Sequence, residues 1–180
     1  MSLIILFGLP GTGKTFIGKV FEKYFDYYFY EGDRDLTREI KSAIKTKTVF
    51  TDQMRNVFFK ILINKIHDLS TQHKKLVIAQ TFIKEKYRVD LLNKIPEAKF
   101  ILIETKKDIR EKRLAERVDY PLDLEYARKM EGNFEKPKII HKVIINDQNG
   151  EENIKRLIKN IVIPAKAGIH SFLDPRLDRG

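Results

Sequence analysis

A run of eight residues near the N-terminus has the composition and spacing of a phosphate-binding loop. It reads Gly8-Leu9-Pro10-Gly11-Thr12-Gly13-Lys14-Thr15 and fits the pattern G-x-x-x-x-G-K-[ST] without a mismatch. Glycines let the backbone turn tightly, so that successive N–H groups face phosphate oxygens, and the helix that follows adds its positive end. We expect Lys14 to reach the β- and γ-phosphates of ATP and the Thr15 hydroxyl to complete the shell of a Mg²⁺ ion. The expected nucleotide contacts are Gly8, Pro10, Gly11, Thr12, Gly13, Lys14 and Thr15.

The residues that follow two later apolar runs favour phosphoryl transfer over hydrolysis. The sequence contains no Asn-Lys-x-Asp motif for guanine, and the run 76–79 ends in Gln80-Thr81 instead of a Mg²⁺-holding Asp. Asp33 follows the run 27–30, and its carboxylate could accept the proton of an attacking hydroxyl. The alternative is that Gly32-Asp33 forms only a turn.

Short apolar runs alternate with helical patterns along most of the chain. The predicted strands are residues 3–7, 27–30, 76–79, 100–103 and 143–145. Apolar residues have helical spacing at 15–25, after Thr51-Asp52, from Val89 to the break at Pro96, at 108–118 and at 153–163. Thr51-Asp52 is the expected N-cap of the second of these helices, and Asp35 is expected to cap a further helix. This alternation indicates an α/β fold with a parallel sheet, helices on both faces and right-handed crossovers.

The composition is that of a globular protein with a basic balance. The chain has 180 residues, a formal net charge of +10 and no cysteine, which excludes disulfides, thiolate zinc sites and cysteine nucleophiles. Lysines and arginines are interleaved with acidic residues, so nucleic acid is an open but not a favoured partner. The N-terminus has neither a basic leader nor a long apolar run, which predicts a cytoplasmic protein without a membrane partner.

The last 17 residues differ from the rest. Residues 1–163 are expected to form one domain, whereas residues 164–180 carry two prolines, two glycines and no periodicity. We expect this tail to be poorly ordered. The alternative is a short docking segment that packs through Ile169 and Phe172.

Several short matches in a fixed order resemble the gluconate-kinase-like branch of small-molecule kinases, relatives of shikimate kinase and of the nucleoside monophosphate kinases. They span about residues 3–160 and comprise the phosphate loop, Gly32-Asp33, the segment 51–58, the segment 82–92 and the segment 100–117. The sequence departs from the family at Val118-Asp119-Tyr120-Pro121, where gluconate kinases carry a His-Phe pair. It departs again at Arg34-Asp35-Leu36, which replaces Leu-His-Pro.

The resemblance implies roles for several cations. Arg55 and Arg88 fall where the family contacts an anionic acceptor, and guanidinium groups suit carboxylates or phosphates. Arg113 and Arg117 lie four residues apart, hence on one helical face, and are similar to lid arginines that stabilise the transferred phosphoryl group. Solvated surface positions are the alternative for all four, and the expected lid covers about residues 117–137. The implied catalytic residues are Lys14, Asp33, Arg113 and Arg117, and the implied acceptor contacts are Asp33, Arg34, Arg55, Lys84 and Arg88.

Residues and resemblance together predict a three-layer P-loop fold with strand order 2-3-1-4-5 and a small lid. The predicted activity is transfer of the γ-phosphoryl group of Mg-ATP to a hydroxyl of a small polar or anionic metabolite, with gluconate or a similar sugar acid first. One alternative is a kinase of a nucleoside, nucleotide or polynucleotide 5′-hydroxyl. Another is a nucleotide-binding regulatory module without transferase activity. The resemblance also leaves a homodimer open.

Overall fold

The apolar runs form a five-stranded, all-parallel sheet. The computed structural model describes residues 1–46, 48, 50–116, 124–148 and 150–162. The strands are β1 (Ser2–Phe7), β2 (Tyr28–Glu31), β3 (Lys75–Ala79), β4 (Lys99–Glu104) and β5 (His141–Ile145). Their order in the sheet is β2-β3-β1-β4-β5, which confirms the predicted order. The loop after β1 therefore lies in the middle of the sheet, at its carboxyl edge, where open parallel sheets bind ligands.

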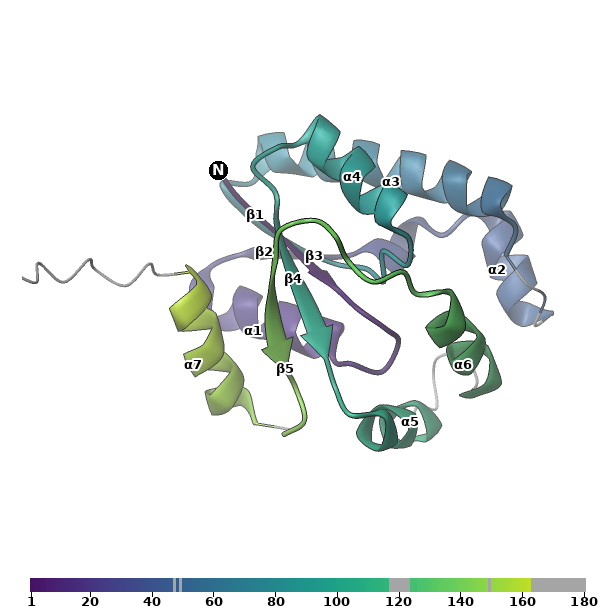
Figure 1. Cartoon of the computed structure of the whole chain (residues 1–180). Helices are drawn as coiled ribbons and strands as arrows, with labels where there is room; N and C mark the ends of the chain where they lie inside the picture. Colours follow the sequence, from purple (N-terminus) through teal and green to yellow (C-terminus); the bar gives the residue numbers. More distant parts are fainter. Residues whose placement is uncertain (47, 49, 117–123, 149, 163–180) are drawn as a thin grey trace, which may run out of the picture.

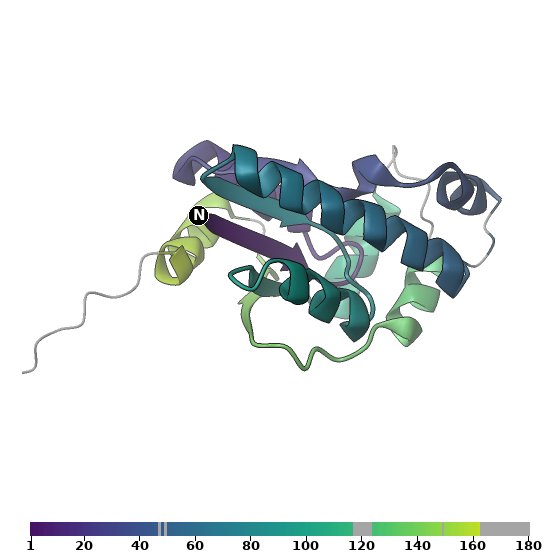
Figure 2. The same cartoon turned by 90° about the horizontal axis from the view of Figure 1, so that it is seen from above.

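Helices cover both faces of this sheet, which confirms the three-layer architecture. The helices are α1 (Lys14–Phe25), α2 (Arg38–Lys45), α3 (Asp52–Gln72), α4 (Glu85–Lys94), α5 (Lys107–Ala115), α6 (Leu124–Asn133) and α7 (Glu151–Val162), with a 3₁₀ turn, η1, at Gly32–Asp35. The helices α3 and α4 lie side by side on one face, and α1 and α7 lie on the other (Figures 1 and 2). The remaining helices, α2, α5 and α6, gather near the carboxyl edge (Figure 1).

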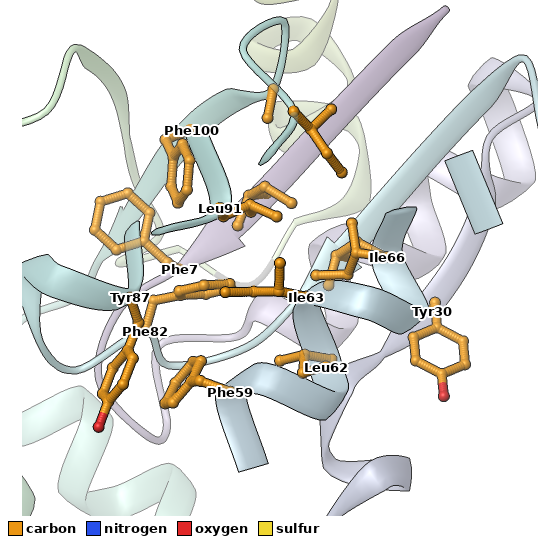
Figure 3. Close-up of a cluster of buried hydrophobic side chains, with 14 of the residues drawn as sticks. Phe7, Tyr30, Phe59, Leu62, Ile63, Ile66, Phe82, Tyr87, Leu91 and Phe100 are labelled. Carbon is orange, nitrogen blue, oxygen red and sulfur yellow. The ribbon is translucent and has the colours of Figure 1, made fainter. Parts of the chain in front are cut away.

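The central strand β1 is buried on both faces, which explains why its sequence is continuously apolar. Leu3, Ile5 and Phe7 join the core beneath α3 and α4, whereas Ile4 and Leu6 join the core above α1 and α7. Figure 3 shows the first of these cores, in which aromatic side chains from the strands and helices gather around Phe7. The alternation fixes the strand register and so fixes where the following loop begins.

The start of α2 corrects one expectation. Asp35 does not cap a helix: it lies in η1 and accepts a hydrogen bond from the Tyr30 hydroxyl at 2.9 Å. Thr37 is the N-cap of α2 instead, because its Oγ1 accepts from the backbone N–H of Ile40 at 3.3 Å. The predicted cap of α3 is confirmed, since Thr51 Oγ1 accepts from the Met54 N–H at 3.2 Å.

Several expectations concern residues that the structure leaves undescribed. Residues 117–123, which include Arg117 and the start of the expected lid, and residues 163–180, the expected tail, lie outside the described ranges. Of the helices that are described, none combines the length and the apolar character that a membrane crossing requires. Within the same ranges, histidines and acidic residues form no cluster of three or more that could hold a metal ion.

Candidate active site

The phosphate loop joins β1 to α1 and has the backbone geometry that its glycines allow. Gly8, Gly11 and Gly13 have φ angles of 139°, 82° and 90°, a region that side chains with a Cβ rarely adopt. The ammonium of Lys14 folds over the loop and donates hydrogen bonds to the carbonyls of Gly8 (2.9 Å) and Leu9 (2.8 Å). The loop therefore holds the Lys14 ammonium close to the N-terminus of α1. The positive end of a helix favours anions such as phosphate at the same place.

Asn146, which follows β5, supports this loop from behind. Its side chain is buried, and Nδ2 donates to the Thr12 carbonyl at 2.8 Å. A Cβ at Gly13 would lie 2.3 Å from the same nitrogen, so only glycine fits there. Sequence reasoning did not single out Asn146, because the contact joins residues that are distant along the chain.

Arg113 lies beside the phosphate loop, and its predicted contact with the transferred phosphoryl group stays a prediction. It extends from α5, and its Nη2 donates to the Asn146 carbonyl at 2.9 Å. Its Nη1 is 3.8 Å from the position that a Cβ on Gly13 would occupy. Burial lowers the pKa of Arg113, and Asp147 opposes that shift. The guanidinium is thus held next to the backbone that would bind phosphates.

Glu31 is a second residue that sequence reasoning missed. It ends β2, and its Oε1 accepts a hydrogen bond from the Thr15 hydroxyl at 2.5 Å. A carboxylate and a hydroxyl are oxygen ligands of the kind that Mg²⁺ prefers. The pair therefore fits the metal that a phosphate loop requires. The available signal was an acidic residue at the carboxyl end of a predicted strand.

Asp33 lies two residues beyond Glu31, in η1. Its Oδ1 accepts a hydrogen bond from Gln80 Nε2 at 2.9 Å, and Gln80 Oε1 in turn accepts from the Thr81 N–H at 2.6 Å. Gln80 is buried at the end of β3, where a hydrolase would carry its metal-binding Asp. In this chain the residue at that place orients a carboxylate instead.

A pocket next to Asp33 is lined by residues of α2, α3 and α6. We call it the acceptor pocket, and Asp33, Arg55, Gln80 and Lys129 lie on its lining. Figure 1 shows α2 and α6 near the carboxyl edge of the sheet. Arg55 lies on the lining, and its Nη1 also pairs with Asp52 at 3.2 Å. Its predicted contact with an acceptor stays a prediction. The pocket therefore brings together a carboxylate and two cations.

Arg88 lies elsewhere, which corrects its expected contact with an acceptor. Its side chain is fully buried, and the guanidinium donates to the carbonyls of Phe82 (2.9 Å), Ile83 (3.3 Å) and Glu135 (2.9 Å). It also pairs with Glu85 at 2.6 Å. Burial lowers the pKa of Arg88, and the pairing with Glu85 opposes the shift. These bonds occupy the guanidinium, and Arg88 is not among the residues that line the acceptor pocket, although its partner Ile83 is.

The two remaining predicted contacts lie at the margin. Arg34 is exposed and lies over the Tyr30 ring, 5.5 Å from its centroid. Lys84 is 3.9 Å from the carboxylates of Asp52 and Glu135. Neither is among the residues that line the pocket. Their expected contacts with an acceptor stay predictions.

Comparisons with known proteins identify a family for this chain. The family model for shikimate kinase matches residues 10–162. A probable gluconokinase from Xenopus tropicalis is 29% identical over 94 residues, which make up 50% of this chain. The match covers 47% of that protein, so the chain spans about half the length of this curated relative.

Solved structures extend the comparison to the whole fold. An unliganded sugar kinase from Janibacter sp. HTCC2649 has a TM-score of 0.77 at 18% identity, with 91% of this chain and 96% of that chain covered. A gluconokinase from Sinorhizobium meliloti 1021 has a TM-score of 0.71 at 17% identity, with 91% and 97% covered. A shikimate kinase from Acinetobacter baumannii, in complex with shikimate, has a TM-score of 0.65 at 14% identity, with 93% and 96% covered.

The family model accounts for most of the chain, and the matched residues include the Lys14–Thr15 pair, Asp33 and Arg113. The structural neighbours share the sheet and its covering helices at low identity, which extends the agreement to the fold. The chain belongs to the shikimate kinase family and has the P-loop kinase fold.

Proposed function

We propose that the protein transfers the γ-phosphoryl group of Mg-ATP to a hydroxyl of a small acceptor that binds in the acceptor pocket. The observation that carries this proposal is the placement of Asp33. Its carboxylate lines the pocket and lies two residues from Glu31, which is bonded to the phosphate-loop residue Thr15. One side of this short segment thus serves the nucleotide and the other serves the acceptor.

In this mechanism the phosphate loop and Lys14 hold the β- and γ-phosphates, and Asp33 accepts the proton of the attacking hydroxyl. Arg113 adds positive charge beside the loop, where charge develops during transfer. Arg117 is proposed to act with it from the lid. Thr15 and Glu31 would hold Mg²⁺, which neutralises phosphate charge when it is bound.

Sugar acids are the first acceptors to consider. The names of two relatives, a probable gluconokinase and a gluconokinase of known structure, support this class. Arg55 adds a cation to the pocket lining and could bind a carboxylate. A cytoplasmic location agrees with such a metabolite and stays part of the proposal.

The test is an assay of ADP release with a panel of acceptors: gluconate, other sugar acids, shikimate, nucleosides and 5′-hydroxyl oligonucleotides. The variant Asp33→Asn should retain ATP binding and lose about 10²–10⁴-fold in kcat, the usual contribution of a general base. Asp68→Asn is the matched control, because Asp68 is an exposed carboxylate on α3. Product analysis by mass spectrometry should show one added phosphoryl group.

The phosphate loop is tested separately. Lys14→Ala should abolish turnover, whereas Lys19→Ala, which removes an exposed lysine from α1, should not. Full activity of Asp33→Asn would show that another group takes the proton. If no acceptor in the panel stimulates ADP release, the protein is a nucleotide-binding module and the proposed transfer is wrong.

A further inference from the structure

The acceptor pocket has walls made mainly of hydrocarbon. Six apolar side chains from α2, α3, α6 and the segment before α3 line it: Ile40, Ile44, Phe50, Phe58, Phe59 and Met130. Phe58 and Phe59 meet edge to face, with ring centroids 5.1 Å apart. Aromatic and aliphatic surface of this extent suits a ligand that has an apolar body and few polar groups.

Most of the polar side chains on the same lining, Thr81 excepted, have protein partners. The pairs are Asp33 with Gln80 (2.9 Å), Arg55 with Asp52 (3.2 Å), Lys129 with Glu125 (2.9 Å) and Asn133 with the Lys129 carbonyl (2.8 Å). Arg55 also lies 6.0 Å from the centroid of the Phe50 ring. These partners reduce the number of donors and acceptors that the pocket offers to a ligand, and Asp52 partly neutralises its arginine.

These two observations disfavour an open-chain sugar acid as the acceptor. Such a molecule carries a hydroxyl on nearly every carbon, and each hydroxyl that is buried without a partner costs roughly a factor of ten or more in affinity. A flat ring has the opposite balance, because its faces gain from contact with Ile44, Phe50 and Phe58. The lining thus departs from the acceptor that the names of the relatives suggest.

We propose that the acceptor is an alcohol built on an aromatic or heteroaromatic ring, for which a nucleoside is the simplest example. The ring lies against the apolar walls, and the hydroxyl points to Asp33. Its oxygen forms a bond to the γ-phosphorus, the bond to the β-bridging oxygen breaks, ADP leaves and the hydroxyl proton passes to Asp33. This inference rests on the proposed phosphotransfer and names a different class of acceptor from the sugar acids considered first.

The experiment compares kcat/KM for two sets of acceptors with the unmodified protein. The first set contains alcohols with an aromatic or heteroaromatic ring, here called ring alcohols: adenosine, thymidine and pyridoxal. The second set contains acceptors without an aromatic ring: gluconate, ribose and shikimate. We expect at least one ring alcohol to exceed gluconate by tenfold or more, with the difference mainly in KM. A preference for gluconate, ribose or shikimate would overturn the inference and leave the phosphotransfer proposal intact. If none of the acceptors is phosphorylated, both the inference and the phosphotransfer proposal are overturned.

A pair of variants tests the wall itself. Ile44→Asn places an amide on the lining near the C-terminal end of α2. It should lower kcat/KM for the best ring alcohol by about tenfold or more and leave KM for ATP unchanged. The control, Ile61→Asn, changes an exposed residue of α3 that is not on the lining, and it should leave both constants unchanged. Thermal melting establishes that each variant is folded. A folded Ile44→Asn protein with an unaltered KM for the acceptor would contradict the proposal that the ring binds against the apolar walls of the acceptor pocket.

Discussion

Glu31 and Asp33 are two carboxylates at the carboxyl end of β2, and their partners differ. Glu31 accepts from the Thr15 hydroxyl of the phosphate loop, whereas Asp33 accepts from Gln80 and faces the acceptor pocket. Successive side chains on a strand point to opposite faces of the sheet. A continuing strand would therefore place Glu31 and Asp33, which are two residues apart, on the same face. The turn η1 begins at Gly32 and changes the direction of the chain between them.

This division predicts separate phenotypes for the two acids. Glu31→Gln keeps an oxygen that can accept from Thr15 but removes the charge that Mg²⁺ attracts. We expect the Mg²⁺ concentration for half-maximal activity to rise about 10–100-fold, the usual effect of losing a supporting group at a metal. Titration of Mg²⁺ at saturating ATP measures it, and Glu22→Gln on the exposed side of α1 is the control. An unchanged Mg²⁺ dependence would remove Glu31 from the metal site.

At the scale of elements, the connection from β2 to α2 depends on Tyr30. Its ring is buried near the end of β2, and its hydroxyl donates to Asp35 at 2.9 Å, which ties the strand to η1. Burial, together with this hydrogen bond, raises the pKa of Tyr30 to about 12. This phenol therefore helps to attach the element that carries Asp33 to the sheet.

The raised pKa makes this attachment sensitive to alkali. An unfolded tyrosine titrates near 10, so the contribution of Tyr30 to stability is complete below about pH 10 and is lost as the pH rises towards 12. Tyr30→Phe should lower the free energy of unfolding by about 1–3 kcal/mol at pH 8. The difference from the unmodified protein should shrink between pH 10 and 12. Urea unfolding across this range measures it, with Tyr28→Phe, an exposed tyrosine, as the control.

At the scale of the molecule, predictions from sequence succeeded where the signal is local and failed where it is not. The phosphate loop and the central strands were predicted because adjacent residues define them. The bond from Gln80 to Asp33 joins residues 47 apart, and no local pattern reports it. A helix after Asp35 was expected, but its cap was wrong, because Thr37 and not Asp35 caps α2.

Arg88 illustrates the limit of transfer by resemblance. A match in sequence placed it at the acceptor, yet its guanidinium lies between the rings of Phe7 and Phe134, with its carbon 5.1 and 5.0 Å from their centroids. Only the folded chain brings β1 and the segment after α6 to the two sides of one side chain on α4. The burial of Arg88 depends on tertiary contacts, which the spacing of residues along the sequence cannot indicate.

The same residue predicts how the molecule is held together. Arg88→Ala should lower the free energy of unfolding by about 3–5 kcal/mol, because it leaves Glu85 half-buried without its cation and opens a space between two rings. Arg156→Ala, an exposed arginine on α7, should change it by no more than about 0.5 kcal/mol. Urea unfolding compares the two. A loss below about 1 kcal/mol for Arg88→Ala would contradict a structural role.

Glu85 gives this junction a dependence on acid. Burial alone would raise the pKa of Glu85, but hydrogen bonds from Arg88 and from the N–H groups of Lys138 and Ile139 outweigh it, so the pKa lies below its ordinary value. A lowered pKa means that the stabilisation is present above about pH 4.5 and is lost as the pH falls through the folded-state value. Glu85→Gln should therefore cost about 3 kcal/mol at pH 7, since Arg88 keeps its charge.

That cost should diminish below pH 4.5, because the unmodified protein then loses the same charge. Urea unfolding at several pH values between 3 and 7 gives the free-energy difference between the two proteins. Glu152→Gln is the matched control, because Glu152 pairs with Lys155 on the exposed side of α7 and should show little effect at any pH. A Glu85→Gln difference that stayed constant from pH 7 to pH 3 would mean that the carboxylate charge does not stabilise the junction between α4 and the segment leading to β5.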